Sequence, residues 1–272
     1  MANYHDRQHF WEARTACAVK VGLLRSDDMM HNRADTVRHA WASICNHYFP
    51  ATTNSGTCYN VERQAYRGPK RPNYKTYTDN RPDVVVSKVS DIQKAPNRGY
   101  FIARERDCLW VECRSPSGRI TPASWKALVK DVTEKLRLCH PKRMLYVILA
   151  IKTRWMIFQW DPSRAKQPPL RMWQAEPGEY WELPDSRLRR PMFNSSASDA
   201  AYFKKKDEKW YIDTNKAGTL NYWTLAPTPK PILKGYVPQP YYSGCLKMLG
   251  NSIMAMQKMS HGDRNTESSD AV

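Results

Sequence analysis

The sequence predicts an α/β domain in which a helix, three strands, a second helix and a strand with a hairpin partner follow one another. Apolar side chains recur at helical spacing in residues 35–49 and 121–139, three consecutive valines stand within residues 81–89, and residues 144–160 contain two apolar segments. At 272 residues the chain can bury one substantial core, so one main domain is expected.

The first helix is predicted from the period of its apolar residues. Trp41 and Ile44 fall on one face of a helix. Asp35 or Thr36 can cap its start, and Pro50 ends it. An amphipathic helix of this kind is expected to cover one face of a sheet.

Three strands are expected between the two helices. The segments are TCYNVERQAY (57–66), RPDVVVSKV (81–89) and CLWVECRS (108–115). The valine run of the second segment is typical of a strand that is buried on both faces.

The second helix has the strongest boundary signals. Thr121 and Pro122 supply an N-cap and a first-turn proline, and Cys139-His140-Pro141 ends the helix. Two apolar strands follow, MLYVILAI (144–151) and RWMIFQW (154–160), joined by a tight turn.

The remaining segments define four expected regions. Residues 1–33 form an N-terminal arm that contains a short helix, and residues 34–163 form the core. Residues 164–246 alternate aromatic segments with turn signals, which predicts a β-rich extension. Residues 247–272 lose periodicity and are expected to be a flexible tail.

The charge balance favours a polyanionic partner. Lys and Arg number 43 against 26 Asp and Glu, a formal net charge of +17. Nucleic acid, DNA or RNA, is the first expectation and an anionic membrane surface the second, while charge scattered evenly over the surface is the alternative.

Targeting signals and cysteines indicate an intracellular protein. The N-terminus lacks an apolar run of the signal-peptide type, and the longest apolar stretch is broken by Lys152 and Arg154, so no membrane anchor is expected. Seven cysteines without a CxxC pair argue against a disulfide framework and a zinc ribbon. A nuclear or cytoplasmic location is therefore expected.

Two charged residues stand on the otherwise apolar third strand. Because side chains alternate along a strand, Trp110, Glu112 and Arg114 share one face. A buried carboxylate is costly unless it is paired or binds a metal, so Glu112 either forms a salt bridge with Arg114 or another neighbour, or belongs to a site. Asp83 follows Pro82 at the start of the second strand and would lie beside Glu112 if the two strands pair.

Two carboxylates with a nearby cation suit the hydrolysis of a phosphodiester. The acids can hold a divalent ion, the ion lowers the pKa of a water molecule, and the cation stabilises the developing negative charge. An all-oxygen donor set of this kind favours Mg²⁺ or Mn²⁺.

These residues resemble the motif of the PD-(D/E)XK nuclease superfamily. Pro82-Asp83 stands about thirty residues before Glu112-Cys113-Arg114, and the similar region covers residues 35–160. The resemblance implies a restriction-endonuclease-like αβββαβ core with a central mixed sheet flanked by helices. It also implies metal-dependent phosphodiester hydrolysis of nucleic acid, with Asp83, Glu112 and the main-chain carbonyl of Cys113 as metal ligands.

The motif departs from the superfamily at one position, where Arg114 replaces its lysine. Arginine keeps the positive charge and can stabilise transition-state charge, but it does not accept a proton. The resemblance therefore leaves an alternative, a catalytically weak or inactive nuclease fold that binds nucleic acid or a protein partner. Such a protein would be regulatory or toxin-like and would use the C-terminal extension as a docking surface.

Members of the superfamily often add groups from the two helices. An acid from the first helix would be Asp35, with Glu12 and Glu62 as further options, and the sequence does not choose among them. From the second helix, Lys126 and Lys130 can face the phosphate or belong to a solvated surface.

Basic loops and clusters extend the expected nucleic-acid surface. Arg67, Lys70, Arg71 and Lys75 stand among tyrosines in residues 66–77, a composition that suits contacts with phosphates and bases, although a solvated loop is the alternative. The clusters at 187–190 and 204–206 could lengthen this surface, and the tryptophans of the extension have no assigned role.

Overall fold

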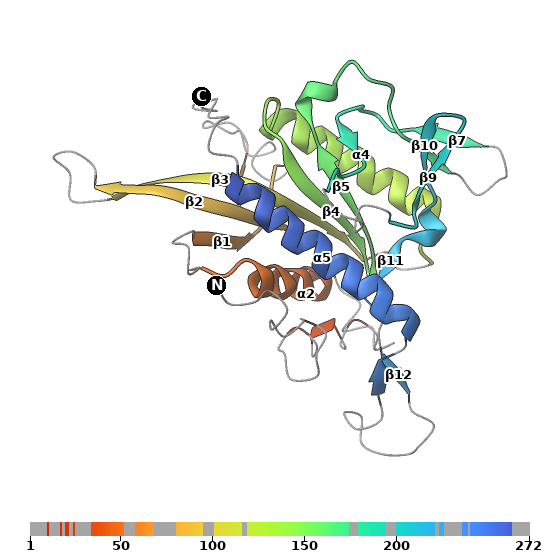
Figure 1. Cartoon of the computed structure of the whole chain (residues 1–272), viewed down its shortest axis with the longest axis horizontal. Coiled ribbons are helices and arrows are strands. Elements are labelled where there is room, and N and C mark those ends of the chain that lie inside the picture. Colours follow the sequence, from red (N-terminus) through yellow and green to blue (C-terminus); the bar gives the residue numbers. More distant parts are fainter. Residues whose placement is uncertain are drawn as a thin grey trace.

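The computed structural model describes most of the chain. The described residues are 10, 17, 20, 21, 24, 34–51, 58–67, 80–94, 101–115, 119–173, 179–193, 200–220, 223–225, 236–238 and 240–262. Figure 1 shows an α/β fold, in which a twisted central sheet is flanked by helices. No described helix is both long enough and apolar enough to cross a membrane.

The central sheet contains seven strands among the described residues, with β1-β2-β3-β4-β5-β11 as neighbours and β8 beside β5. Their bounds are β1 Cys58–Arg63, β2 Val84–Lys94, β3 Phe101–Arg114, β4 Leu145–Ile151, β5 Arg154–Trp160, β8 Leu188–Arg189 and β11 Gly218–Thr219. Strands β1, β2 and β3 are antiparallel in turn, β3 and β4 are parallel, and β4 and β5 are antiparallel.

The strand and helix predictions of the core are confirmed, with two strands longer than expected: β2 continues to Lys94, beyond the predicted end at residue 89. β3 begins at Phe101 rather than near residue 108, and with β2 it forms a ribbon that extends beyond the other strands (Figure 1). All seven residues of β4 are buried, as expected for a strand with parallel and antiparallel neighbours and helices on both faces. Lys152, with φ 52°, makes the tight turn into β5.

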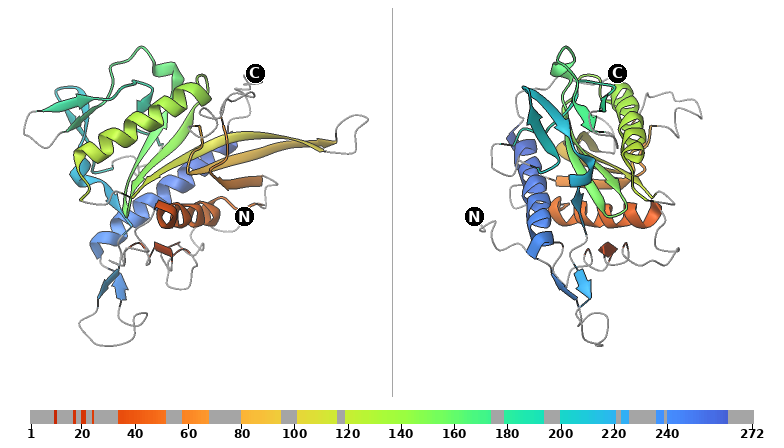
Figure 2. Two further views of the ribbon diagram at one scale, coloured as in Figure 1. Left: turned by 180° about the vertical axis from the view of Figure 1, so that it is seen from behind. Right: turned by 90° about the vertical axis from the view of Figure 1, so that its right-hand side faces the viewer.

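Three helices among the described residues cover the sheet, α2 (Ala34–Tyr48), α4 (Pro122–Cys139) and α5 (Pro240–Gly262). Figures 1 and 2 show α2 and α5 on one face and α4 on the other. Thr121 accepts the backbone N–H of Ser124 in a capping box at the start of α4. The crossover from β3 through α4 to β4 brings the end of β3 next to one side of α4.

The N-terminal arm contributes to the core. Four of its five described residues, Phe10, Cys17, Val21 and Leu24, are buried, and Lys20 is partly buried. The thiol of Cys17 donates to the carbonyl of Ser43 on α2 at 3.1 Å, which ties the arm to the first helix.

The extension at 164–246 is rich in short strands, as the sequence predicts. A second sheet of order β7-β6-β10-β9 contains β6 Arg171–Trp173, β7 Tyr180–Glu182, β9 Phe203–Lys206 and β10 Lys209–Ile212, and a two-stranded sheet pairs β12 Trp223–Leu225 with β13 Tyr236–Pro238. Short 3₁₀ helices lie at Pro162–Arg164 (η2) and Thr214–Lys216 (η4). Because β8 and β11 both pair with β5, the extension also completes the central sheet.

The prediction of a flexible tail from residue 247 is wrong for residues 247–262, which belong to α5. The buried residues Leu246, Leu249, Ile253 and Met256 have helical spacing. The pattern is hard to recognise in the sequence because polar Ser252 and Gln257 are buried on the same helix. Residues 263–272 lie outside the described part of the chain.

Candidate functional site

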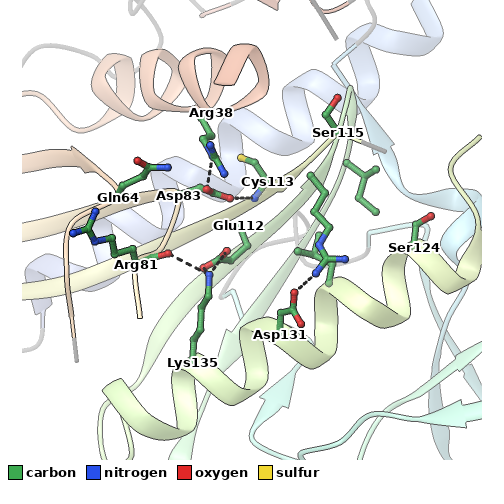
Figure 3. A pocket seen from close by; sticks show the side chains of 13 residues that line it. Arg38, Gln64, Arg81, Asp83, Glu112, Cys113, Ser115, Ser124, Asp131 and Lys135 are labelled. Atoms are coloured by element: carbon green, nitrogen blue, oxygen red, sulfur yellow. Dashed lines mark hydrogen bonds and ion pairs between the residues drawn. The ribbon is translucent and has the colours of Figure 1, made fainter. Parts of the chain in front are cut away.

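A cavity of about 600 Å³ lies where β2 begins and β3 ends, between α2 and α4 (Figure 3). The described residues that line it are Arg38, Gln64, Arg81, Asp83, Glu112, Cys113, Arg114, Ser115, Ser124, Leu128, Asp131, Lys135 and Ile151. Val84 pairs with Val111, so the strand register puts Asp83 next to the end of β3 that carries Glu112. The pocket therefore brings together the two carboxylates that the sequence singles out.

Asp83 is buried and held by two donors. The guanidinium Nε of Arg38, on α2, donates to Oδ1 at 2.5 Å. The main-chain N–H of Cys113 donates to Oδ2 at 2.7 Å. These two bonds fix the carboxylate across the gap between β2 and β3.

Glu112 is also buried, with 4% of its surface exposed, and its partner comes from α4. The Lys135 ammonium donates to both carboxylate oxygens, at 2.9 and 3.1 Å, and to the Arg81 carbonyl at 3.2 Å. Burial, joined by the negative charge of Asp83, raises the pKa of Glu112 to about 7, although Lys135 opposes the rise. The two carboxylates are thus electrostatically coupled.

Arg114 pairs with Asp131 of α4 rather than with Glu112. Glu112 and Arg114 lie on the α4 side of β3, as strand alternation predicts, and each finds its own partner on the helix (Figure 3). A salt bridge to a neighbour accounts for both charges, but both pairs also line the cavity. The salt bridges therefore explain why these charges are tolerated but do not exclude a functional role for Glu112 and Arg114.

The charges of the pocket favour an anionic ligand. Among its described lining residues, the cations are Arg38, Arg81, Arg114 and Lys135, and the acids are Asp83, Glu112 and Asp131. The formal balance is positive by one charge when all seven are ionised. A divalent cation bound by the acids would increase this excess, which suits a phosphate group.

The donor atoms around Asp83 fit a hard divalent cation. The backbone N–H of Lys152 donates to the Arg114 carbonyl, so the Arg114 backbone faces β4. Successive residues point their backbone groups to opposite edges of a strand, so the Cys113 carbonyl faces the Asp83 side together with its N–H. Two carboxylates and this carbonyl match the sparse protein ligation of Mg²⁺. The described residues contain no group of three His, Cys, Asp or Glu side chains that could hold a metal.

Sequence reasoning missed two cations that contact the acids, Arg38 and Lys135. Leu128, Asp131 and Lys135 recur at intervals of three and four residues and form the stripe of α4 that faces the pocket. That stripe was the signal available in the sequence. Nine residues separate Lys126 from Lys135, half a turn out of phase, which places the two on opposite sides of the helix.

The other predicted contact residues that the structure describes, Arg67, Lys126 and Lys130, do not line the pocket. Lys126 and Lys130 are exposed, and the Lys126 ammonium lies 5.1 Å from the centre of the Trp181 ring. Arg67 is half-buried, and its guanidinium donates to Asp107 and Glu62. Lys70, Arg71 and Lys75 lie outside the described residues.

Two of the three optional acids, Asp35 and Glu62, are described and do not line the cavity. Asp35 accepts from Arg38 at 2.9 Å and Glu62 accepts from Arg67 at 2.9 Å, and neither lines the cavity. Glu12 lies outside the described residues. Asp83 and Glu112 are thus the two buried carboxylates among the described lining residues, since Asp131 is exposed.

The raised pKa of Glu112 predicts how the stability of the metal-free protein depends on pH. The folded state holds this proton more tightly than the unfolded chain, so the stabilising effect is complete below pH 4.5 and is lost as pH rises to about 7. Between pH 5 and 8 this group is expected to lower the free energy of unfolding by about 3 kcal/mol. Urea unfolding in EDTA at both pH values measures the loss.

The Glu112→Gln variant is the matched control for this titration. It cannot ionise at this position, so its free energy of unfolding is expected to change less between pH 5 and 8 than that of the wild type. The comparison cancels the contribution of other groups, including His39, whose pKa is lowered by partial burial and by Arg63. Equal pH dependence in the two proteins would contradict the buried, coupled state of Glu112.

The pocket unites Asp83, Glu112, Cys113 and Arg114, the predicted metal and catalytic residues, and adds Lys135. The arrangement places carboxylates, an amine and guanidinium groups around one cavity (Figure 3). Comparison of the chain with protein-family models, with curated proteins and with solved structures finds no match.

Proposed function

We propose that the chain is a metal-dependent nuclease with a restriction-endonuclease-like core, which hydrolyses phosphodiester bonds of nucleic acid in this pocket. The observation that carries the proposal is the convergence of Asp83 and Glu112, from two strands, on a cavity that also holds the Lys135 amine. The net positive charge of the chain supports a nucleic-acid substrate.

The order of elements supports this proposal independently of the site residues. A helix, three antiparallel strands, a helix and a strand parallel to the third correspond to α2, β1, β2, β3, α4 and β4. The same order describes the αβββαβ core of the PD-(D/E)XK superfamily. Asp83, immediately before β2, and Glu112, near the end of β3, would correspond to the motif positions of that order.

Asp83, Glu112 and the Cys113 carbonyl would hold Mg²⁺ or Mn²⁺. A bound ion of this kind supplies an activated water molecule and neutralises charge on the phosphate. The protein fixes the ligands beforehand, because the Cys113 N–H and Arg38 orient the Asp83 carboxylate. Ionisation of Glu112 is required for this role, so binding of the ion strengthens as pH rises through about 7.

Lys135 can exchange a proton, which the guanidinium of Arg114 cannot do. It is the one amine among the described residues that line the pocket, and amines exchange protons whereas guanidinium groups stay charged. Lys135 can therefore hold or transfer a proton beside Glu112. Arg114, on the same face of β3, can stabilise negative charge on the phosphate.

Replacing Lys135 by methionine or arginine tests the proposed function. Wild-type protein is expected to cleave labelled single- or double-stranded DNA or RNA with Mg²⁺ or Mn²⁺ and to stop in EDTA. Lys135→Met is expected to lower the cleavage rate by about 10²-fold, the usual contribution of proton transfer. Lys135→Arg retains the charge beside Glu112 and is expected to lose a similar factor.

The two variants distinguish proton transfer by Lys135 from simple neutralisation of Glu112. They also reveal a contaminating nuclease. Full activity of Lys135→Arg would show that the lysine only neutralises Glu112, which contradicts its role in proton transfer. A contaminating nuclease would cleave equally in all three preparations. Absence of metal-dependent cleavage by wild-type protein on every substrate would overturn the proposed function.

A second candidate is a nuclease fold that binds nucleic acid without hydrolysing it. The observation that favours it is that Arg38 and Lys135 already neutralise both carboxylates without a metal ion. The arginine at position 114 agrees with this alternative. Salt-dependent binding of nucleic acid by wild-type protein, without cleavage in either metal, would establish it.

A further inference from the structure

The second sheet turns one of its faces away from the core. Met172 of β6, Ile212 of β10 and Phe203 of β9 are buried and lie in cross-strand register, so they define the inner face. Side chains one residue away along each strand must point to the opposite face. The outer face therefore carries Arg171, Trp173, Tyr180, Glu182, Lys204, Lys206, Lys209 and Tyr211.

Three aromatic rings lie side by side on this outer face. The Trp173 and Tyr180 rings are stacked, with centroids 6.1 Å apart and planes inclined by 24°. The Tyr180 and Tyr211 rings are 4.7 Å apart. Trp173 and Tyr180 are partly exposed, whereas Tyr211 is buried beneath its neighbours. The sheet thus presents two accessible rings that a third supports.

Cations surround these rings. The Lys204 ammonium lies 5.3 Å from the centre of the Trp173 ring, and it also pairs with Asp213. Lys206 and Lys209 are exposed and directly opposite each other on β9 and β10. The turn between them carries Asp207 and Glu208, and Glu208 pairs with Lys205. Lys206 and Lys209 therefore remain as exposed cations at directly opposite positions, where a phosphate can contact both.

We propose that this outer face binds single-stranded nucleic acid. Unpaired bases would stack on Trp173 and Tyr180, while phosphates would contact Lys206 and Lys209. A duplex keeps its bases stacked inside and offers no free ring face to these side chains. The pairing of accessible aromatic rings with exposed cations therefore fits a single strand better than a duplex.

The face is separate from the candidate nuclease pocket. Helix α4 presents Lys135 to the pocket and Lys126 to the Trp181 ring of β7, on the opposite side of the helix. Figures 1 and 2 show the strands of the second sheet beside α4 and away from α2. Trp181 is opposite Met172 and therefore belongs to the inner face of the second sheet. Binding at the outer face does not require cleavage in the pocket, so it can be measured without metal.

Fluorescence anisotropy in EDTA tests this proposal on the full chain. The probes are labelled 12-nucleotide DNA and RNA strands, an abasic strand of equal length and a 12-base-pair duplex. Trp173→Leu is expected to weaken binding of the base-bearing strands about tenfold, as loss of one stacked base does, and to leave the abasic strand nearly unchanged. Trp173→Phe retains a ring and is expected to restore most of the affinity.

Charge variants test the phosphate contacts. Lys206→Glu is expected to weaken all three strands and to reduce the salt dependence of binding, whereas Lys166→Glu, at an exposed position outside the sheets, changes little. The abasic strand has phosphates but no bases, so its affinity reports the electrostatic contribution to binding alone. Circular dichroism melting confirms that each variant is folded.

Four results would overturn the proposal. The first three are equal affinity of the wild type for abasic and base-bearing strands, tighter binding of the duplex than of the single strand, and a folded Trp173→Leu variant with wild-type affinity. Loss of binding in both Trp173→Leu and Trp173→Phe would likewise contradict a stacking role. All are independent of whether the pocket cleaves.

Discussion

Replacing Glu112 by glutamine is expected to lower metal-dependent cleavage by about 10⁴-fold or more, because a bound ion contributes nucleophile, charge neutralisation and orientation together. The amide keeps the size of the side chain but removes its negative charge. Asp83→Asn removes the second carboxylate of the same pocket and is expected to have a comparable effect. In the proposed mechanism both acids would bind one ion, so their combined loss should hardly exceed either single loss.

Metal binding and folding can be measured separately from cleavage in these variants. Mn²⁺ is expected to raise the melting temperature of wild-type protein at pH 8 and to have much less effect on Glu112→Gln. Glu105→Gln is the matched control, since Glu105 stands on β3 but is exposed and outside the pocket. If a folded Glu112→Gln variant cleaves at the wild-type rate, the carboxylate pair has no role in catalysis.

Replacing Asp107 by alanine is expected to lower the free energy of unfolding by about 3–5 kcal/mol, the cost of breaking a buried ion pair. Asp107 accepts from the Arg67 guanidinium at 3.0 Å, from the Trp110 indole at 3.0 Å and from the Ser87 hydroxyl at 3.0 Å. His140 Nε2 also lies 3.2 Å from it. All four partners would lose an acceptor inside the protein.

Urea unfolding at pH 7 measures this loss of stability. The same measurement at low pH provides a second test of the role of Asp107. Burial alone would raise the pKa of Asp107, but the hydrogen bond with His140 and the charge of Arg67 hold it below its ordinary value. Its stabilising effect is thus complete above the ordinary pKa and is lost as pH falls below it. Wild type and Asp107→Ala should therefore converge in strong acid.

Asp35→Ala supplies the comparison for an exposed ion pair. The Asp35 side chain is 73% exposed where it meets Arg38, so this substitution should cost less than about 1 kcal/mol. A similar small cost for Asp107→Ala would contradict the importance of the buried network.

The local periodicity of the sequence was enough to predict most of the core. Helical spacing identified α2 and α4, and apolar runs identified β2, β4 and β5, because burial of one face imposes a period on the residues that form it. Strand alternation also placed Glu112 and Arg114 on one face of β3. Where polar residues are buried, as on α5, this signal fails.

The partners of the charged residues required the tertiary structure. The sequence suggested that Arg67 meets nucleic acid, but packing brings it to Asp107. It also selected Lys126 and Lys130, whereas the helix presents Lys135 to Glu112. The spacing of residues within one element indicates which side chains share a face, but the partner that each of them meets depends on strand register and on how the elements pack.

The sequence by itself therefore determined the element order, the shared face of Glu112 and Arg114, and the pair of acids at the strand ends. Only the tertiary structure decided that Arg38 and Lys135 meet those acids, that β8 and β11 complete the central sheet, and that aromatic rings and cations share the outer face of the second sheet. The reason is physical: local patterns record which side of an element is buried, whereas contacts between elements depend on how the whole chain packs.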